Sequence, residues 1–428
     1  MLARIGALGD SNAVAAPTPR EIALRILRRW ERGEAYVDTL LYRELPTITG
    51  RDRLLCQELV YGIVRRRGTL DWLIEQFTSG RRQPALVQMI LRIGIYQIFW
   101  LDRVPGHAAV NETVALARKC DIGTASGFVN AVLRNSLRKE SALRHQLEEL
   151  KQSNPSIAHS HPDWLLHRWQ AQWGEAETAR LLEWNNCRSQ NFARINSLRN
   201  PPDTAYKSIS FNWTDENFLL FDGAAELLPG FSEGNFYIQD PSTLLAVELL
   251  NPKPGETVLD FCASPGGKTT AIAARMKNGG RIVATDIHED RLTRLRENCE
   301  RLGADCVEVM PHGTYVRERF DSVLIDVPCS NTGVMRRRVD LRWRLQPQDL
   351  KSAVKTQRDI LLKAARNVKP GGLLIYSTCS LEAEENTGQV ENFLSTRNDF
   401  KLETERALLP FRDKVDGAYV AALRSTPL

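Results

Sequence analysis

Residues 255–287 read GETVLDFCASPGGKTTAIAARMKNGGRIVATDI, and this stretch decides the fold of the C-terminal half. A β-like run, ETVLDFC, leads through a loop of small residues to a helical run, GKTTAIAARM, and then to a second β-like run that ends at Asp286. The runs CVEVM, FDSVLID and LLIYSTC are further predicted strands, and residues 289–302 and 349–368 are predicted helices. This alternation predicts a mostly parallel sheet that is covered by helices on both faces.

The loop DFCASPGGKTT lies between the first predicted strand and the first predicted helix. Its small residues allow a ligand to approach the backbone, and the N-terminus of the helix offers free N–H groups. A Walker-type phosphate loop is disfavoured, because Cys262 stands where that motif requires glycine. The next strand ends in Asp286, where an acid can accept hydrogen bonds from a ribose diol. Loop and acid together favour a nucleoside cofactor over a structural turn with an Asp cap.

Two cysteines follow predicted strands directly. FDSVLID ends at Asp326 and continues as Val-Pro-Cys329, and LLIYS continues as Thr-Cys379. Ligands of open α/β sheets bind at the carboxyl ends of the strands, so two thiols there indicate chemistry rather than packing. A thiolate beside a nucleoside cofactor suits methylation of a pyrimidine: it adds to carbon 6, activates carbon 5 toward an electrophilic methyl group, and leaves after a base removes the proton from carbon 5. Asp326 is placed to hold the ring-nitrogen edge of a cytosine that has left its stack.

The N-terminal third of the chain has a different pattern of apolar residues from this region. Residues 20–139 show helical periodicity without strand alternation and predict an all-α domain. Short β-like runs after Asn191 predict a small mixed subdomain. The expected organisation is a flexible N-terminus at 1–18, an all-α domain at 19–140, a helical connector with a small α+β subdomain at 141–235, and a catalytic domain at 236–428.

Composition excludes several classes of protein. The chain has 428 residues, of which 43% are hydrophobic, and a net charge of +5, so it is neither a disordered chain nor a small disulfide scaffold. Basic residues are in excess over 1–150 and 251–428 and acidic residues over 151–250, a distribution that fits contact with a polyanion or, equally, solvated helix surfaces.

The eight cysteines form no CxxC pair, so no metal site is expected. The N-terminal residues make a poor signal peptide, and no stretch approaches the roughly 20 apolar residues that span a bilayer, so we expect a cytoplasmic protein without membrane contact.

Three motifs carry a resemblance to a known family. DFCASPGGKT, DVPCSNTGVMRR and STCSLEAEEN resemble motifs of the Sun-type RNA cytosine-C5 methyltransferases, which use S-adenosylmethionine on a Rossmann-like fold. RDRLLCQELVYGIVRRRGTLDWLI, LRIGIYQIFWLDRVPGHAAVNETV and GFVNAVLRN resemble the NusB-like RNA-binding domain of one branch of that family. The resemblance extends over residues 20–425. It implies an α/β S-adenosylmethionine-dependent methyltransferase, acting as a monomer on a cytosine of 16S ribosomal RNA that is free or in an early assembly intermediate.

The resemblance also implies roles for individual residues. Cys379 is the nucleophile, and Cys329 assists product release as the base or through one; in DNA enzymes the Pro-Cys cysteine is the nucleophile instead. Asp326 orients the cytosine and lies near the methyl donor. Asp286 accepts from the ribose hydroxyls, and His312, where the family often has Asp, would accept from the adenine amine only as the neutral imidazole. The methionine and ribose side of the cofactor is held by Cys262, Ala263, Ser264, Pro265, Gly266, Gly267 and Lys268.

Other features leave alternatives open. Ser264 replaces a usual Ala, which is tolerated if its hydroxyl points away from the cofactor. The arginine runs 65–67 and 336–338 are candidates for contacts with RNA phosphate or are solvated helix faces. The same chemistry on another RNA such as tRNA is one alternative function, and a non-catalytic RNA-binding or assembly factor is another. Loss of methyl transfer in Cys379→Ala would separate the enzyme from the binding factor.

Overall fold

The computed structural model describes residues 16–81, 83–120, 122, 125–199, 207–223, 228–314 and 317–427. Most of the predicted flexible N-terminus, residues 1–15, lies outside this part of the chain. The chain divides into two compact units, Met1–Gly174 and Glu175–Leu428. The division falls inside helix α10 (Asp163–Asn186), where Gly174 has a φ of 78°. This boundary between the two units also lies inside the connector predicted at 141–235. The predicted limits of the four domains stay predictions.

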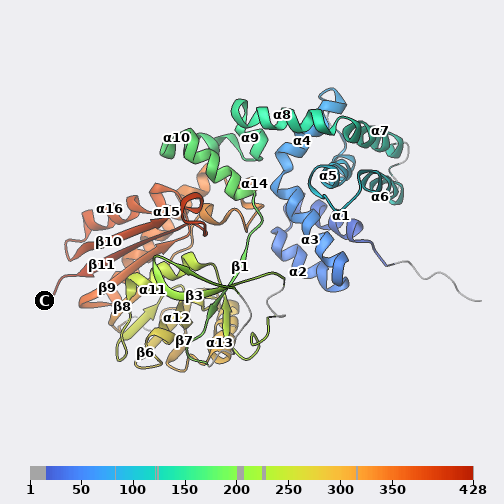
Figure 1. Cartoon of the computed structure of the whole chain (residues 1–428). Coiled ribbons are helices and arrows are strands. Elements are labelled where there is room, and N and C mark those ends of the chain that lie inside the picture. The colour runs from blue at the N-terminus through green and yellow to red at the C-terminus, as the bar shows by residue number, and fades with distance from the viewer. Residues whose placement is uncertain are drawn as a thin grey trace, which may run out of the picture. The chain divides into compact units, whose positions relative to one another are not determined.

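The described residues of the first unit form helices and no strand, as the periodicity predicts (Figure 1). Helix α5 is apolar on nearly every side and almost wholly buried, and it contacts α1, α3, α4, α6 and α7. At the start of α1, Thr18 and Glu21 form a reciprocal capping box, which satisfies N–H groups that the helix itself cannot pair. The helices are α1 Pro19–Glu31, α2 Val37–Glu44, α3 Gly50–Arg65, α4 Arg67–Thr78, α5 Ala85–Trp100, α6 Gly106–Lys119, α7 Ala125–Arg138, α8 Glu140–Ser153 and α9 Pro155–His159.

A small antiparallel sheet opens the second unit, where the sequence predicts a mixed subdomain. Its strands are β1 Asn191–Ile195, β2 Lys207–Phe211, β3 Thr214–Phe221 and β4 Phe236–Ile238. They lie in the order β2-β3-β1-β4, so β1 pairs with both β3 and β4.

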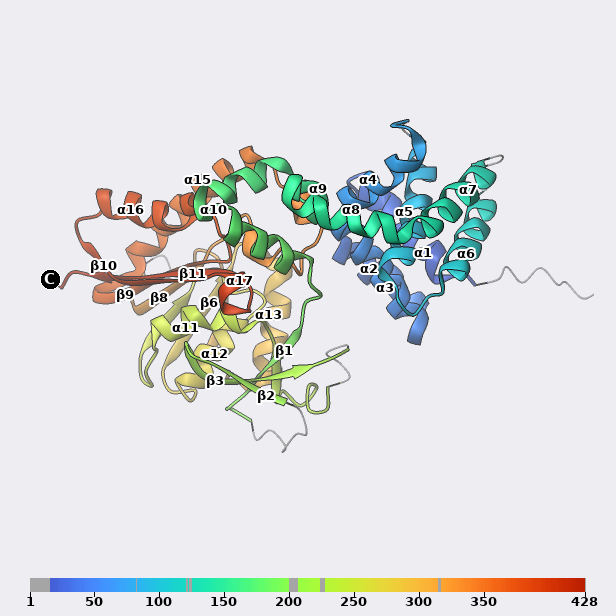
Figure 2. The same ribbon diagram turned by 45° about the horizontal axis from the view of Figure 1, so that its top comes forward.

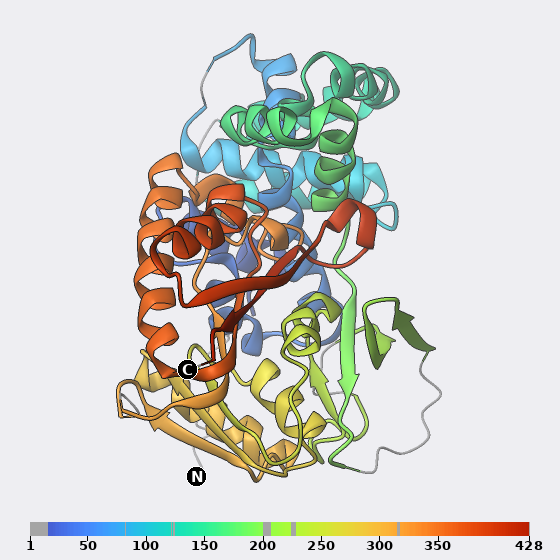
Figure 3. The same cartoon turned by 90° about the vertical axis from the view of Figure 1, so that its left-hand side faces the viewer.

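A seven-stranded sheet in the order β10-β11-β9-β8-β5-β6-β7 forms the main part of the second unit. Its strands are β5 Thr257–Asp260, β6 Arg281–Asp286, β7 Val307–Pro311, β8 Phe320–Asp326, β9 Val368–Thr378, β10 Phe400–Leu408 and β11 Ala418–Ser425. Strands β5 to β9 are parallel, which confirms the mostly parallel sheet, and the hairpin of β10 and β11, red in Figure 3, joins it antiparallel through β9. The sequence pattern does not predict these two strands. Strand β10 is exposed except at its two ends, so it lacks the alternation that marks a half-buried strand.

Helices cover both faces of this sheet (Figure 2). Val258 of β5 packs into an apolar cluster with residues of α11, α12 and α13, whereas its neighbour Leu259 packs with residues of α15 and α16 on the opposite face. The helices of this unit are α11 Leu245–Leu250, α12 Gly267–Arg275, α13 Glu289–Leu302, α14 Leu341–Arg344, α15 Pro347–Ala364, α16 Thr387–Thr396 and α17 Pro410–Asp413. The carboxyl ends of β5, β6, β8 and β9 meet at one edge, where the predicted site residues follow the strands. No helix in the described part of the chain is long and apolar enough to cross a membrane.

Candidate active site

The loop between β5 and α12 is fixed to its neighbours by backbone bonds. The N–H of Ala263 donates to the carbonyl of Thr285 at 2.8 Å, which ties the loop to the end of β6. Gly266 has a φ of 106°, a conformation that favours glycine. The Ser264 hydroxyl donates to the carbonyl of Arg291 at 3.2 Å, so it is engaged by α13.

A cavity of about 420 Å³ lies beside this loop, at the carboxyl end of the large sheet. Gly266, Asp286, His312 and Cys329 are not among the described residues that line it. Asp286 lies at the end of β6, is 7% exposed, and accepts the backbone N–H of His288 at 3.0 Å. The predicted site residues that do line the cavity are Cys262, Ala263, Ser264, Pro265, Gly267, Lys268, Asp326 and Cys379.

The cavity wall contains polar atoms that the chain itself leaves unpaired. The Oδ1 atom of Asp260 and both amide atoms of Gln239 are buried without a hydrogen-bond partner among the described residues. A Cβ atom at Gly267 would lie 2.8 Å from the ring of Tyr237 and 2.9 Å from the Gln239 oxygen, so glycine is needed for this close packing. Buried polar atoms without partners are rare in folded proteins, and here they face a space of ligand size. The site therefore fits a polar ligand such as a nucleoside cofactor.

Carboxylates concentrate around the loop. Burial, together with the charges of Asp326 and Asp286, raises the pKa of Asp260 to about 7, although Thr269 and Lys268 act in the opposite direction. The hydroxyl of Thr269 donates to Asp260 Oδ2 at 2.7 Å. Lys268, Arg337 and Arg338 also line the cavity, so acidic and basic side chains both face the ligand space.

Lys268 reaches across the cavity to Asp326 at the end of β8. Its Nζ donates to Asp326 Oδ2 at 2.5 Å, and the Ser377 hydroxyl donates to Asp326 Oδ1 at 3.2 Å. Burial lowers the pKa of Lys268, but the charge and hydrogen bond of Asp326 outweigh it, and the net pKa is raised. The cavity thus holds a fixed ion pair in which the lysine is protonated.

The structure brings Cys329 and Cys379 together. Their Sγ atoms lie 3.4 Å apart. The Cys379 thiol donates to Asn331 Oδ1 at 3.1 Å, and Asn331 Nδ2 donates to the Cys329 carbonyl at 2.7 Å. Asn331 has a φ of 59°, a left-handed conformation that asparagine tolerates better than most residues. The sequence analysis did not select Asn331, although it lies two residues after Cys329 and is a polar residue in the same motif.

The two thiols are not equivalent. The hydrogen bond with Cys379, burial, and the charges of Cys379 and Glu385 raise the pKa of Cys329 well above its usual value. Cys329 therefore keeps its proton at neutral pH. Cys379 lines the cavity beside the loop, whereas Cys329 is not among the described residues that line it, and this difference favours Cys379 as the thiol that acts as nucleophile.

His312 lies apart from the cavity but close to the loop. Its ring meets the ring of Phe261 edge-on, with centroids 4.9 Å apart. Desolvation and the charge of Lys363 lower the pKa of His312, and Asp286 opposes them. The imidazole is therefore neutral at pH 7, the form that can accept a hydrogen bond.

The run 336–338 mostly serves the interior of the unit. Arg336 is buried, with its guanidinium 3.9 Å from the ring centroid of Trp184. Arg337 donates to the carboxylate of Asp416 at 2.5 Å. Arg338 is exposed and lines the cavity, and its contact with RNA phosphate stays a prediction.

In the first unit, two residues of the run 65–67 lie over aromatic rings. The guanidinium of Arg66 is 4.8 Å from the ring centroid of Trp100, and that of Arg67 is 5.6 Å from that of Trp30. These contacts give both side chains a packing role, and their contact with phosphate stays a prediction.

Family models match three parts of the chain. The model described as 16S rRNA methyltransferase RsmB/F matches residues 247–424. The NusB family model matches residues 17–138, and a ferredoxin-like domain of RsmF/B-like methyltransferases matches residues 161–210. These matches confirm the predicted NusB-like domain, the methyltransferase fold and S-adenosylmethionine as the cofactor.

Known proteins resemble the chain over most of its length. A probable ribosomal RNA small subunit methyltransferase B of Synechocystis sp. is 36% identical, and the alignment covers 95% of this chain and 99% of that protein. The crystal structure of a methyltransferase homologue from Pyrococcus horikoshii is 28% identical, with a TM-score of 0.56 over 63% of this chain and 97% of that one. NSun6 from Pyrococcus horikoshii, solved with SFG, has the same fold at 20% identity, with a TM-score of 0.57 over 62% of this chain and 99% of that one.

Proposed function

Because the chain belongs to the ribosomal RNA small subunit methyltransferase B family, we propose that it transfers a methyl group from S-adenosylmethionine to carbon 5 of a cytosine in 16S ribosomal RNA. The observation that carries this proposal is the pair of thiols, 3.4 Å apart, one of which lines the same cavity as the cofactor loop. Methylation at a nitrogen or oxygen atom has no use for a thiol nucleophile, whereas carbon 5 of a pyrimidine needs one.

Cys379 begins the reaction. Its thiolate adds to carbon 6 of the cytosine, and the electron pair of the ring double bond moves so that carbon 5 becomes nucleophilic. Asp326, which Lys268 and Ser377 hold by hydrogen bonds, would contact the ring-nitrogen edge of the cytosine and favour the addition. Residues 262–268, with Asp286 and His312, would hold S-adenosylmethionine, which would supply an electrophilic methyl group to carbon 5 and leave as S-adenosylhomocysteine.

Cys329 completes the reaction by removing the proton that carbon 5 still carries. Two of the causes that raise its pKa are the hydrogen bond to Cys379 and the charge of Cys379. Both are lost once the Cys379 sulfur is bonded to carbon 6, so the pKa of Cys329 falls, and the Cys329 thiol releases its proton to solvent before it acts as the thiolate base toward carbon 5. When the proton leaves carbon 5, the double bond re-forms and Cys379 departs as the thiolate. The product is a 5-methylcytosine and the enzyme is free for another turnover.

The substrate and the oligomeric state are proposed from the family of the chain. The chain carries its RNA-binding and catalytic parts together, which supports a monomer that acts on ribosomal RNA in the cytoplasm, on free RNA or on an early assembly intermediate.

Transfer of a labelled methyl group to unmodified 16S ribosomal RNA tests the proposal. Wild type should label the RNA, Cys379→Ala should not, and Cys329→Ala should accumulate a covalent protein–RNA adduct because elimination is blocked. Cys187→Ala is the matched control, since this cysteine is exposed and lies away from the cavity lining.

Three results would argue against the proposal. Methyl transfer that persists in Cys379→Ala would exclude Cys379 as the nucleophile. Labelling of tRNA but not of ribosomal RNA would move the same chemistry to another substrate. RNA binding without transfer to any RNA would indicate a binding or assembly factor.

A further inference from the structure

The buried carboxylate of Glu385 lies between the two cysteine loops. Glu385 ends the short 3₁₀ helix η6 (Ala383–Glu385), and its side chain is 0% exposed. Ser330 directly follows Cys329, and Ser380 directly follows Cys379. Both serines bond to Glu385, so the acid joins the loop after β8 to the loop after β9.

Four donors meet the two oxygens of this acid. Oε1 accepts the backbone N–H of Ser330 at 2.9 Å and Nε2 of Gln357 at 2.8 Å. Oε2 accepts the hydroxyl of Ser380 at 2.5 Å and the hydroxyl of Ser330. A buried carboxylate is costly unless hydrogen bonds satisfy its oxygens, and here both oxygens are satisfied by the elements that must be held together.

The acid is itself anchored from two sides. Gln357, on α15, also donates to the carbonyl of Pro328 at 3.0 Å, just before Cys329. The hydroxyl of Tyr376, on β9, donates to the backbone carbonyl of Glu385 at 2.6 Å. Glu385 is therefore a fixed point against which both loops are set, rather than a mobile side chain.

We propose that Glu385 is a positioning residue that sets the distance between the Cys329 and Cys379 thiols. This inference rests on the proposed function, because it names what fixes the two groups that the function uses. Cys379 must reach carbon 6 while Cys329 reaches the proton on carbon 5, so one loop cannot shift relative to the other. A displacement of about 1 Å at reacting groups costs on the order of 100-fold in rate.

The chemistry of the donors predicts which substitution is tolerated. Both donors at Oε1 are N–H groups, of which the backbone N–H of Ser330 cannot accept and Gln357 Nε2 also donates to Pro328, whereas both donors at Oε2 are hydroxyls, which can donate or accept. In Glu385→Gln the amide oxygen can stay at the Oε1 position while its NH₂ group donates to the two hydroxyls. In Glu385→Ala both serine hydroxyls and the Gln357 amide lose their shared acceptor. Glu384→Gln is the matched control, since this neighbouring carboxylate is exposed.

The first experiment measures thiol geometry and needs no methyl transfer. Diamide takes up the two hydrogen atoms that are lost when two thiols become a disulfide, and mass spectrometry of peptides identifies the Cys329–Cys379 link. Wild type, Glu384→Gln and Glu385→Gln should form it at similar rates, and Glu385→Ala should form it at least tenfold more slowly, because loosened loops lower the effective concentration of one thiol at the other. Equal rates in Glu385→Ala and wild type, or no link in wild type, would overturn the proposal.

The second experiment guards against a variant that fails to fold. Ser380→Ala removes one donor and leaves three on the acid, so it should retain the thermal midpoint of wild type within a few degrees. With 16S ribosomal RNA as substrate, its kcat should fall at least tenfold while the KM for RNA and the affinity for S-adenosylmethionine stay unchanged. An unchanged kcat, or a rise of KM alone, would contradict a positioning role. If wild type transfers no methyl group at all, the proposed function fails while the diamide rates still decide the role of Glu385.

Discussion

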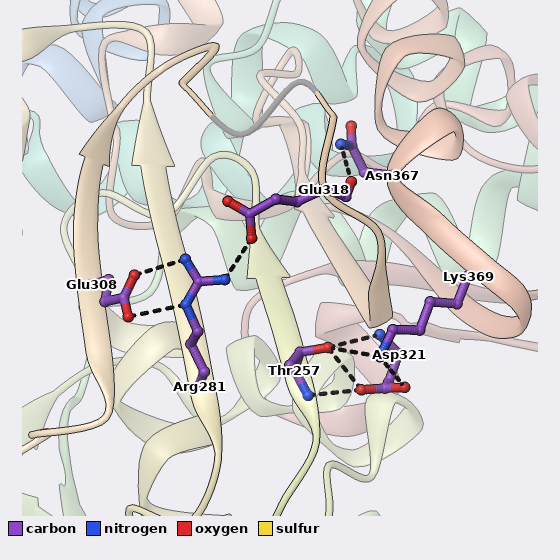
Figure 4. Close-up of polar contacts among 7 residues, drawn as sticks. All are labelled: Thr257, Arg281, Glu308, Glu318, Asp321, Asn367 and Lys369. Carbon is purple, nitrogen blue, oxygen red and sulfur yellow. Dashed lines mark hydrogen bonds and ion pairs between the residues drawn. The ribbon is translucent and has the colours of Figure 1, made fainter.

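The two ends of the seven-stranded sheet are built from the same strands but treat polar groups in opposite ways. At the amino end, charged side chains meet charged or polar partners (Figure 4). Arg281, at the start of β6, donates to both oxygens of Glu308 at 2.8 and 2.9 Å and to Glu318 at 2.5 Å. Asp321, near the start of β8, accepts from the N–H and hydroxyl of Thr257 and from Lys369.

At the carboxyl end, several groups are held in place without being fully satisfied. Asp260 Oδ1 and the Gln239 amide have no partner in the described residues, and two thiols face one another. An unpaired buried polar atom costs roughly 1–3 kcal/mol, so a fold tolerates it where a ligand restores the bond. The amino end of the sheet therefore contributes to the stability of the fold, and the carboxyl end contributes the reactive groups.

Strand β8 allows the sharpest test, because it carries an aspartate near each end. Asp326→Asn removes the carboxylate that pairs with Lys268 and orients the base, so kcat/KM should fall by on the order of 100-fold or more. Asp321→Asn should leave kcat/KM within about twofold of wild type, because Asp321 lies at the other end of the strand. Steady-state methyl transfer to 16S ribosomal RNA measures both. Equal losses of kcat/KM in the two variants would show that the two ends of the sheet do not differ in their roles.

A smaller effect is expected at His312, beside the carboxyl end. The pKa of His312 is lowered, so the imidazole is neutral at pH 8 and pH 7 and becomes charged only below its usual range near pH 6.5. Affinity for S-adenosylmethionine should be constant from pH 8 to pH 7 and should weaken several-fold as the pH falls to 5, because the charged ring cannot accept from the adenine amine. Calorimetric titration of the wild type and of His312→Asp measures this dependence. A wild type and a variant with the same pH profile would show that His312 does not contact the cofactor.

Much of the carboxyl end could be predicted from sequence, because its key residues follow strands directly. Alternation of strands and helices predicts the sheet, and the strand ends then locate Asp286, Asp326, Cys329 and Cys379. The proximity of the two cysteines follows from β8 and β9 being neighbours, which the parallel pairing confirms.

Features set by contacts between distant segments could not be predicted in this way. Glu385 is five residues from Ser380 but 55 from Ser330, so its role depends on the pairing of two loops. The sequence left Arg337 as either a phosphate contact or part of a solvated helix face, because its partner Asp416 is 79 residues away. Strand β10 could not be predicted because its exposed residues show no alternation of apolar and polar side chains.

The smallest expected effect concerns stability at the amino end. Burial raises the pKa of Asp321, but hydrogen bonds from Lys369 and Thr257 outweigh it and lower the pKa to about 2, below the ordinary value of 3.8. A carboxylate with a depressed pKa stabilises the fold above about pH 4, and this contribution is lost as the pH falls through about 2. Because the group is partly exposed, Asp321→Asn should destabilise the second unit by about 1 kcal/mol or less at pH 6, and its difference from wild type should shrink between pH 4 and pH 2. Urea midpoints at pH 6, 4, 3 and 2 measure this, and a difference that stays constant down to pH 2 would show that the ionised carboxylate is not its source.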